Sequence, residues 1–231
     1  MLEEAIGSEQ KISQVLVDET KIEVWQDLIA AHSQWEWIAV SPGVFKHISD
    51  TQTPSGIAAL VMMNNYDWLS LLEEQKILLL LDAVTDPGNM GTIIRTAWAL
   101  GIDGILLLPD CVDVYSPKVV RASMGGIFNV PLFQVNMEQV EQLCHQGYRI
   151  MAASADGDVS VYEADFSGSL LICIGNERRG INQDLQNISR IKVKIPTNPK
   201  ADSLNAAVAC SIIVAQAWQQ RQNSGSSYLR Y

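Results

Sequence analysis

The organisation of this chain is set by residues 77–95, which read ILLLLDAVTDPGNMGTIIR. Its first five residues, Ile77 to Leu81, are apolar without alternation, which predicts a strand buried on both faces of a parallel sheet. A glycine-rich turn follows, and apolar residues then recur at helical spacing up to Leu100. A turn that joins such a strand to a helix lies at the carboxyl edge of the sheet, where ligands bind in α/β folds.

The turn itself, from Asp82 to Arg95, has a structural and a functional interpretation. Asn89 could cap the following helix, and the glycines permit the tight turn. Arg95 lies beside the apolar stripe of the helix, where it could form a surface salt bridge or face a ligand at the mouth of the turn. The turn matches neither G-x-G-x-x-G nor G-x-x-x-x-G-K-[ST], which disfavours a dinucleotide-binding or P-loop site.

Further apolar runs predict more strands of the same sheet, and helical patterns separate them. This alternation predicts an α/β fold with a mostly parallel sheet flanked by helices. The other predicted strands are Ile105–Leu108, Ile150–Ala153, Leu170–Ile174 and Ile191–Ile195, and the predicted helices are Gly91–Leu100, Pro117–Met124, Met137–Gln146 and Ser203–Arg221.

Two more loops follow predicted strands and carry polar residues. In residues 174–181, IGNERRGI, Glu177 could hold the loop through backbone N–H groups, or it could bind a ligand or a neighbouring subunit. In residues 195–209, IPTNPKADSLNAAVA, Ser203 is expected to cap a helix of small residues, and Asn205 offers a second polar group at its start. Capping alone could explain both residues.

The first third of the chain predicts a separate small α/β unit. Extended runs and a helical stretch from Lys21 alternate there, and Ser41 followed by Pro42 suits a helix start. The extended runs are Ile12–Val17, Trp37–Val40 and Ile57–Met63. The predicted domains are 1–75, a small substrate-binding-like α/β domain, 76–222, the main domain, and 223–231, a flexible polar tail.

Charge is unevenly distributed along the chain. The formal net charge is −10, of which residues 1–75 carry −9. Because affinity for phosphate backbones comes mainly from Lys and Arg, phosphate contacts are not expected from this first part. A short later stretch could form a local basic surface or hold scattered solvated charges, and its basic residues are Arg178, Arg179, Arg190, Lys192, Lys194 and Lys200.

The cysteine content and the length of the apolar runs disfavour a metal-binding protein and a membrane protein. The four cysteines, Cys111, Cys144, Cys173 and Cys210, form no C-x-x-C pair and have no nearby His, so we expect small buried residues and no metal site. No apolar run is long enough to cross a bilayer. These features predict a soluble cytoplasmic protein with no membrane partner.

Taken together and in this order, the three loops resemble the SpoU (TrmH-like) family of RNA 2′-O-ribose methyltransferases, in the SPOUT superfamily. Residues 116–125, SPKVVRASMG, are also similar to a segment of family members that modify ribosomal or transfer RNA. The resemblance covers Ile77 to about Trp218. The matching residues are Asn89, Gly91 and Arg95 for N-x-G-x-x-x-R, Gly175 and Glu177 for G-x-E, and Ser203, Leu204 and Asn205 for S-L-N.

The resemblance implies a C-terminal trefoil knot whose loops bind S-adenosylmethionine, without any metal. It also implies a homodimer with the active site at the subunit interface, and a structured RNA as substrate, with ribosomal RNA preferred and transfer RNA next. By resemblance, the cofactor-binding residues are Ser154, Gly175, Ile195 and Leu204.

The catalytic residues implied by the resemblance are Arg95, Asn89, Glu177, Ser203 and Asn205. Arg95 would activate the ribose 2′-hydroxyl, either as a general base or by orienting the RNA phosphate and the hydroxyl. Orientation by paired hydrogen bonds is physically easier, because free arginine has a pKa above about 12. The other four residues would orient the arginine, the loop and the ribose.

Two features depart from the family pattern. The third loop contains Thr197–Lys200 where relatives commonly have Gly, and the N-terminal domain is expected to be shortened at its start. Two other interpretations stay open at this point. One is a non-catalytic RNA- or cofactor-binding relative of the same fold. The other is a Rossmann-type small-molecule enzyme, which the absence of G-x-G-x-x-G disfavours.

Overall fold

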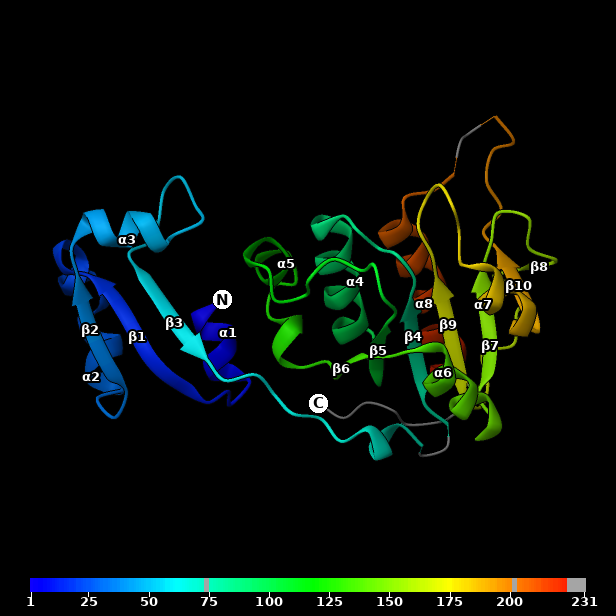
Figure 1. Cartoon of the computed structure of the whole chain (residues 1–231), viewed down its shortest axis with the longest axis horizontal. Helices are drawn as coiled ribbons and strands as arrows, with labels where there is room; N and C mark the ends of the chain where they lie inside the picture. Colours follow the sequence, from blue (N-terminus) through cyan, green and yellow to red (C-terminus); the bar gives the residue numbers. More distant parts are fainter. Residues whose placement is uncertain (73–74, 201–202, 224–231) are drawn as a thin grey trace. The chain divides into compact units, whose positions relative to one another are not determined.

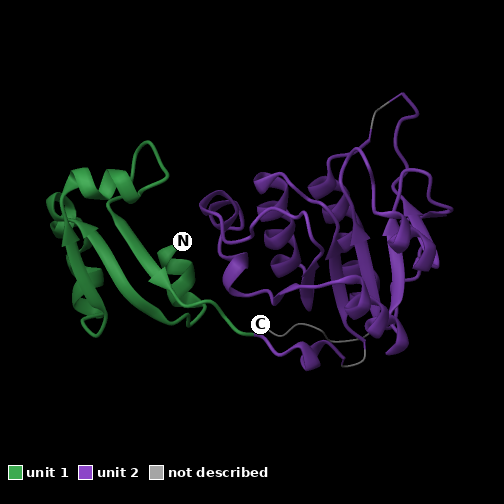
Figure 2. Cartoon of the chain, viewed as in Figure 1, with its two compact units in different colours: residues 1–65 green, residues 66–231 purple. Residues whose placement is uncertain are grey.

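The computed structural model describes residues 1–72, 75–200 and 203–223. The chain forms two compact units, Met1–Asn65 and Tyr66–Tyr231 (Figure 2). The second unit begins earlier than the predicted boundary at residue 76, because Leu71 is buried in it and the Leu71 carbonyl accepts a hydrogen bond from the Tyr148 hydroxyl at 2.7 Å. Of the predicted tail 223–231, Asn223 ends the last helix and the rest lies outside the described residues.

The first unit is a small α/β structure, as predicted. Its elements are α1 (Leu2–Gly7), β1 (Ile12–Asp18), η1 (Glu19–Trp25), α2 (Gln26–Ala31), β2 (Glu36–Val40), α3 (Pro42–Ile48) and β3 (Ile57–Val61). The strand order is β2-β1-β3, with β1 parallel to β2 and antiparallel to β3. The predicted helix start is confirmed, because the Ser41 side chain accepts a hydrogen bond from the Val44 N–H and Pro42 begins α3.

The second unit contains a seven-stranded sheet (Figure 1). Its elements are η2 (Trp68–Leu72), β4 (Ile77–Leu81), α4 (Pro87–Ala99), β5 (Gly104–Leu107), α5 (Pro117–Ala122), η3 (Gly126–Phe128), β6 (Leu132–Gln134), α6 (Met137–His145), β7 (Arg149–Ala153), β8 (Val159–Ser160), β9 (Leu170–Ile174), α7 (Gln183–Ile188), β10 (Ile191–Lys194) and α8 (Ala206–Asn223). The strand order is β6-β5-β4-β9-β7-β10-β8, and every adjacent pair is parallel. The predicted parallel sheet is therefore confirmed.

Helices cover both faces of this sheet, which explains the unbroken apolar strands. Alternate residues of β4, such as Leu79, pack with α4, α5 and α8, and the intervening residues, such as Leu80, pack with α6 and α7. Helices α4 and α8 lie side by side on the first of these faces (Figure 1). Strand β9 lies between β4 and β7, although it follows both in sequence. A Rossmann order would place β7 directly beside β4, so the Rossmann-type alternative is wrong.

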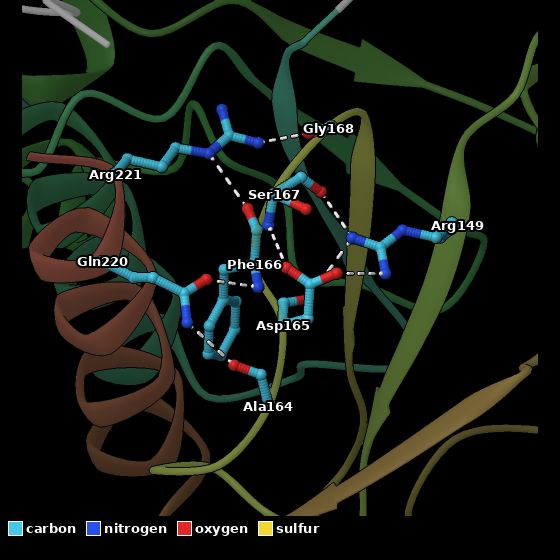
Figure 3. A network of polar contacts seen from close by, with 8 residues as sticks. All are labelled: Arg149, Ala164, Asp165, Phe166, Ser167, Gly168, Gln220 and Arg221. Carbon is cyan, nitrogen blue, oxygen red and sulfur yellow. Dashed lines mark hydrogen bonds and ion pairs between the residues drawn. The ribbon is translucent and has the colours of Figure 1, made fainter. Parts of the chain in front are cut away.

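A polar network fastens the end of α8 to the segment that precedes β9 (Figure 3). The Arg221 side chain, only 9% exposed, donates from Nε to the Phe166 carbonyl at 3.1 Å and from Nη2 to the Gly168 carbonyl. The Gln220 side chain donates to the Ala164 carbonyl at 3.0 Å and accepts from the Phe166 N–H at 2.6 Å. These two side chains satisfy backbone groups of residues 164–168, which lie between strands β8 and β9 and alternate between buried and exposed positions.

On the other side of the same segment, Arg149 of β7 forms an ion pair with Asp165 at 3.1 Å (Figure 3). Hydrogen bonds from Ser167 hold the pKa of Asp165 below its usual value, and the Arg149 charge acts in the same direction. The ionised Asp165 therefore favours the folded state above the pKa of an ordinary Asp. This contribution is lost as the pH falls through the lowered pKa.

We expect Arg221→Met to lower the free energy of unfolding by roughly 2–4 kcal/mol, because the buried Phe166 carbonyl and the Gly168 carbonyl both lose a charged donor. Urea unfolding followed by circular dichroism measures this change. Gln219, which is exposed on the same turn of α8, provides the matched control. Gln219→Met should change the stability by less than about 0.5 kcal/mol. Equal stabilities of the two variants would contradict a structural role for the Arg221 contacts.

The cysteines are free and two of them are fully buried. Burial raises the pKa of Cys210 to about 12 and raises that of Cys173 as well. The prediction of small buried residues is confirmed for these two, whereas Cys111 and Cys144 are half-buried. Among the described residues, no cluster of three potential metal ligands occurs, and no helix is long and apolar enough to span a membrane.

Candidate functional site

The three loops singled out in the sequence all follow carboxyl ends of strands in one parallel sheet. They follow β4, β9 and β10, and parallel strands bring their carboxyl ends to the same edge. Two of these strands, β4 and β9, are direct neighbours. The topology therefore places side chains from distant parts of the sequence at one edge, where α/β proteins bind ligands.

Side-chain hydrogen bonds join the three loops directly. The Asn89 amide donates from Nδ2 to the Glu177 carboxylate, and the Asn205 amide donates from Nδ2 to Asn89 Oδ1 at 2.8 Å. The Ser203 hydroxyl donates to the Glu177 carbonyl oxygen at 3.4 Å. Four of the five predicted catalytic residues therefore form one cluster, although Asn89 and Asn205 lie 116 residues apart in the sequence.

Helix capping differs from the sequence prediction, and the difference leaves two site residues available. The N-cap of α4 is Asp86, whose carboxylate accepts a hydrogen bond from the Asn89 N–H at 2.8 Å. Asn89 is therefore not the cap, because the helix already begins at Pro87. Its amide reaches across to the neighbouring loop instead.

At α8 the prediction that Ser203 is the N-cap is also wrong. The helix begins at Ala206, and Asn205 Oδ1 accepts hydrogen bonds from the N–H groups of Ala207 at 3.0 Å and Val208 at 3.2 Å. Asn205 uses its oxygen for the helix and its nitrogen for Asn89. Ser203, two residues earlier, is left to contact the β9–α7 loop.

Arg95 is not part of this cluster within one chain. It is exposed on α4, and it makes no hydrogen bond or ion pair with residues 1–72, 75–200 or 203–223. Its backbone packs against η3, since a Cβ added to Gly126 would lie 3.2 Å from Arg95 Cα. The backbone of Arg95 is therefore held in place by packing, whereas its side chain is exposed to solvent.

A cavity of about 510 Å³ adjoins the cluster. Its walls come from the ends of β7, β9 and β10, the loops that follow them, and the start of α8. This volume lies within the range of small-molecule and cofactor pockets. All four predicted cofactor-binding residues line it, together with Glu177 and Ser203: they are Ser154, Gly175, Ile195 and Leu204.

Two glycines allow the cavity walls to pack closely. A Cβ on Gly175 would lie 2.3 Å from the backbone carbonyl carbon of Gly180, and a Cβ on Gly157 would lie 2.5 Å from that of Val193. Only residues without side chains fit at such backbone approaches. The sequence motif identified Gly175, whereas Gly157 was missed because it belongs to none of the three loops.

Two further residues of the site were missed although they stand inside the quoted motifs. The Asp82 carboxylate, 8% exposed, accepts a hydrogen bond from the Asn182 N–H at 2.6 Å. The Asn176 amide donates to the Ala83 carbonyl at 3.2 Å. Both contacts hold the β9–α7 loop against the loop after β4. The only feature of the sequence that could have identified these two residues is their position just after a predicted buried strand.

Comparison with known families and proteins identifies this arrangement. The model of the SpoU rRNA methylase family matches residues 76–215, which is more than half of the chain. The chain belongs to the SpoU rRNA methylase family. The family match covers every element of the sheet and all of the residues that form the cluster and the cavity.

Individual relatives are similar to this protein along most of the chain. The 23S rRNA (guanosine(2553)-2′-O)-methyltransferase RlmP of Bacillus subtilis is 32% identical over 93% of this chain and 84% of its own. The 23S rRNA (uridine(2479)-2′-O)-methyltransferase of Streptomyces viridochromogenes is 35% identical over 80% of this chain and 68% of its own.

A solved SpoU-family structure shows the same fold. The methyltransferase AviRb from Streptomyces viridochromogenes, in complex with the cofactor AdoMet, matches with a TM-score of 0.85 and 30% identity over 96% of this chain and 87% of that chain. The C-terminal trefoil knot implied by the family stays a prediction. After β10 the chain returns to α4, where Thr96 and Ser211 share a hydrogen bond of 3.1 Å.

Proposed function

We propose that this chain is an S-adenosylmethionine-dependent methyltransferase that methylates a ribose 2′-hydroxyl of ribosomal RNA. The observation that carries the proposal is the joining of three separate loops by Asn89, Glu177 and Asn205 beside a cofactor-sized cavity. Family membership and the similarity to RNA 2′-O-methyltransferases over most of the chain support the same reaction.

The cavity fits the cofactor in its size and in the groups that line it. Ser154, Gly175, Ile195 and Leu204 would hold S-adenosylmethionine, mainly through backbone groups of the loops. The close backbone approach at Gly175 leaves peptide groups rather than side chains at the cavity wall. When bound, the cofactor supplies a methyl group made electrophilic by its sulfonium sulfur.

The protein must then position the acceptor hydroxyl. Its oxygen would form a bond to the methyl carbon as the bond from that carbon to the sulfonium sulfur breaks, which leaves a neutral thioether, and its proton would pass to the neighbouring RNA phosphate or to solvent. Holding the reacting groups in line lowers the barrier to reaction, by roughly 7–11 kcal/mol in the best-oriented reactions. Arg95 would bind the RNA phosphate and orient the hydroxyl through its paired N–H donors. Asn89, Glu177, Ser203 and Asn205 would hold the loops rigid around it.

A homodimer would bring Arg95 to such a site. Large apolar side chains are exposed on α4 and α8, namely Trp98 (41% exposed), Val208 (48%) and Trp218 (38%). Trp98 follows Arg95 by one helical turn. Burial of this surface against a second copy would carry Arg95 into the shared interface, where it could reach the cavity of the partner subunit.

The cellular compartment follows from the proposed substrate. The relatives named above come from bacteria, whose ribosomal RNA lies in the cytoplasm, and we place this chain in the cytoplasm as part of the proposal. The RNA preference rests on relatives whose names specify 23S rRNA.

Methyl incorporation tests the proposal. The wild-type chain is incubated with radiolabelled S-adenosylmethionine and one of two RNA substrates. One substrate is unmodified 23S rRNA and the other is unmodified transfer RNA. We expect label in 23S rRNA, and nuclease digestion should yield a 2′-O-methylated nucleoside. Label on a base instead of a ribose would contradict the proposed reaction, and label in transfer RNA alone would contradict the proposed substrate.

A non-catalytic RNA- or cofactor-binding relative is the second candidate. It is favoured by one observation, the separation of Arg95 from the cluster within a single chain. Binding of S-adenosylmethionine and RNA without any methyl incorporation is the result expected of it.

Asn205→Asp should separate the structural and the catalytic roles of this residue. Asp caps helices as well as Asn, so the free energy of unfolding should change by less than about 0.5 kcal/mol. The carboxylate cannot donate to Asn89 and adds a charge beside Glu177, so methyl transfer should fall roughly 10- to 100-fold. Asn205→Ala is the comparison, which should lose both activity and about 1 kcal/mol of stability. Full activity of Asn205→Asp would show that the Asn89 contact is dispensable.

A further inference from the structure

The tip of the β9–α7 loop presents two arginines beside the cavity. Arg178 and Arg179 are both exposed, and both contribute to the cavity lining. Their side chains form no hydrogen bond or ion pair with any residue that the structure describes. Two consecutive residues therefore present unpaired guanidinium groups at the edge of the proposed active site.

The backbone beneath these arginines is firmly held. Asn176 Oδ1 accepts hydrogen bonds from the N–H groups of Arg178 at 3.0 Å and Arg179 at 3.4 Å. Asn176 also pairs with Gly180 through backbone hydrogen bonds of 3.2 and 2.8 Å, which closes the tip into a small hairpin. Because the tip is already ordered, a ligand that binds the arginines needs to restrict only their side chains.

The charge around the tip selects the kind of ligand. The chain as a whole carries −10, yet Arg178, Arg179 and Lys192 all lie at this cavity. One of the two nearby acidic side chains, Glu177, is engaged by Asn89, and the other is Asp156. Guanidinium groups bind phosphate through paired hydrogen bonds. Two adjacent, exposed guanidiniums match the repeated phosphates of an RNA backbone better than the single carboxylate of the cofactor.

We infer that Arg178 and Arg179 bind backbone phosphates of the RNA substrate next to the acceptor nucleotide, and so position its ribose over the cavity. The inference rests on the proposed function, since it concerns the substrate of that same site. It also accounts for RNA binding by an acidic protein. The phosphate contacts are concentrated where the reaction occurs, whereas residues 1–75 carry most of the negative charge.

The inference is tested by measuring the affinity for 23S rRNA transcribed in vitro. Filter binding gives this affinity at potassium chloride concentrations between about 50 and 200 mM. The double variant Arg178→Gln/Arg179→Gln should bind the RNA roughly tenfold more weakly. The slope of log affinity against log salt should flatten by about 0.7–0.9 for each phosphate that the variant no longer binds. Calorimetry should give an unchanged affinity for S-adenosylmethionine. The variant Arg178→Lys/Arg179→Lys should recover most of the salt dependence, because it keeps both charges.

Arg190→Gln is the matched control, because Arg190 is also exposed but precedes β10 and lies at the opposite end of the sheet. It should leave RNA affinity and the salt slope unchanged. The inference is overturned if the double glutamine variant keeps the wild-type slope, or if it loses cofactor affinity instead of RNA affinity. Absence of methyl transfer by the wild-type chain would refute the proposed function. If the wild-type chain is active but the double variant binds RNA normally, only the present inference is refuted.

Discussion

Replacing Arg95 with alanine is expected to reduce methyl transfer to RNA by roughly 10³-fold or more, with S-adenosylmethionine affinity unchanged. The side chain is exposed on α4 and does not line the cavity of its own chain, so its removal disturbs neither the core nor the cofactor walls. Single-turnover methyl transfer measures the chemical step, and calorimetry measures cofactor binding. Arg190→Ala removes an exposed arginine at the far end of the sheet and should keep full activity.

Arg95→Lys distinguishes the two roles considered for this residue. If Arg95 orients the phosphate and the hydroxyl, lysine keeps the charge but not the paired donors, and activity should stay low at every pH. If Arg95 acts as a base, lysine loses its proton more easily, and activity should rise toward pH 10. We expect the first outcome. Wild-type activity of Arg95→Ala would refute any catalytic role.

The second large effect is expected for Gly175→Ala, which should weaken S-adenosylmethionine binding by at least about tenfold. The added Cβ would lie 2.3–2.5 Å from backbone atoms of Gly180 and Ile181. Because these are backbone atoms, the β9–α7 loop must move as a whole, and Glu177 moves with it. Such overpacking costs about 1–3 kcal/mol of stability. Calorimetric titration and thermal unfolding measure the two effects.

Gly43→Ala is the control for this substitution. Gly43 lies in α3 and has no atom within 4 Å of an added Cβ. Its replacement should leave cofactor binding unchanged and could stabilise the helix by up to about 1 kcal/mol. A folded Gly175→Ala variant with wild-type cofactor affinity would show that the β9–α7 loop does not form the cofactor site.

Mixing Arg95→Ala with Gly175→Ala, at an S-adenosylmethionine concentration too low to load the Gly175→Ala cavity, tests whether the site is shared between subunits. If Arg95 acts on the cavity of the partner subunit, a heterodimer of Arg95→Ala and Gly175→Ala contains one intact site. Random subunit exchange should then restore about a quarter of the wild-type activity. If Arg95 acts within its own chain, mixing should restore nothing.

Much of the fold follows from local sequence. Strands β4 and β9 have the predicted bounds, because each is a run of five consecutive apolar residues, the pattern typical of a strand covered on both faces. By contrast, the sequence did not predict strands β6 and β8 or the short polar helix α7. Strands β6 and β8 have only three and two residues and lie at the two edges of the sheet. Edge strands and surface helices bury little apolar surface, so they leave a weak pattern in the sequence.

The candidate site divides in a similar way. The motifs identified Asn89, Glu177, Ser203 and Asn205, but local capping rules assigned the wrong caps to α4 and α8. Several residues suit a helix start, and contacts with the neighbouring loop decide which of them caps the helix. The basic residues for which the sequence left a local surface or scattered charges open are divided, because Arg190 lies at the opposite end of the sheet from Arg178 and Arg179.

The sequence by itself determined that the chain alternates buried strands with helices and that three polar loops follow those strands. Both are local properties, set by apolar runs and turn residues over a few positions. Only the tertiary structure decided that β9 lies between β4 and β7, and that Asn89 therefore meets Glu177 and Asn205. These contacts join residues 88 and 116 positions apart, so they depend on the path of the whole chain and not on any local preference.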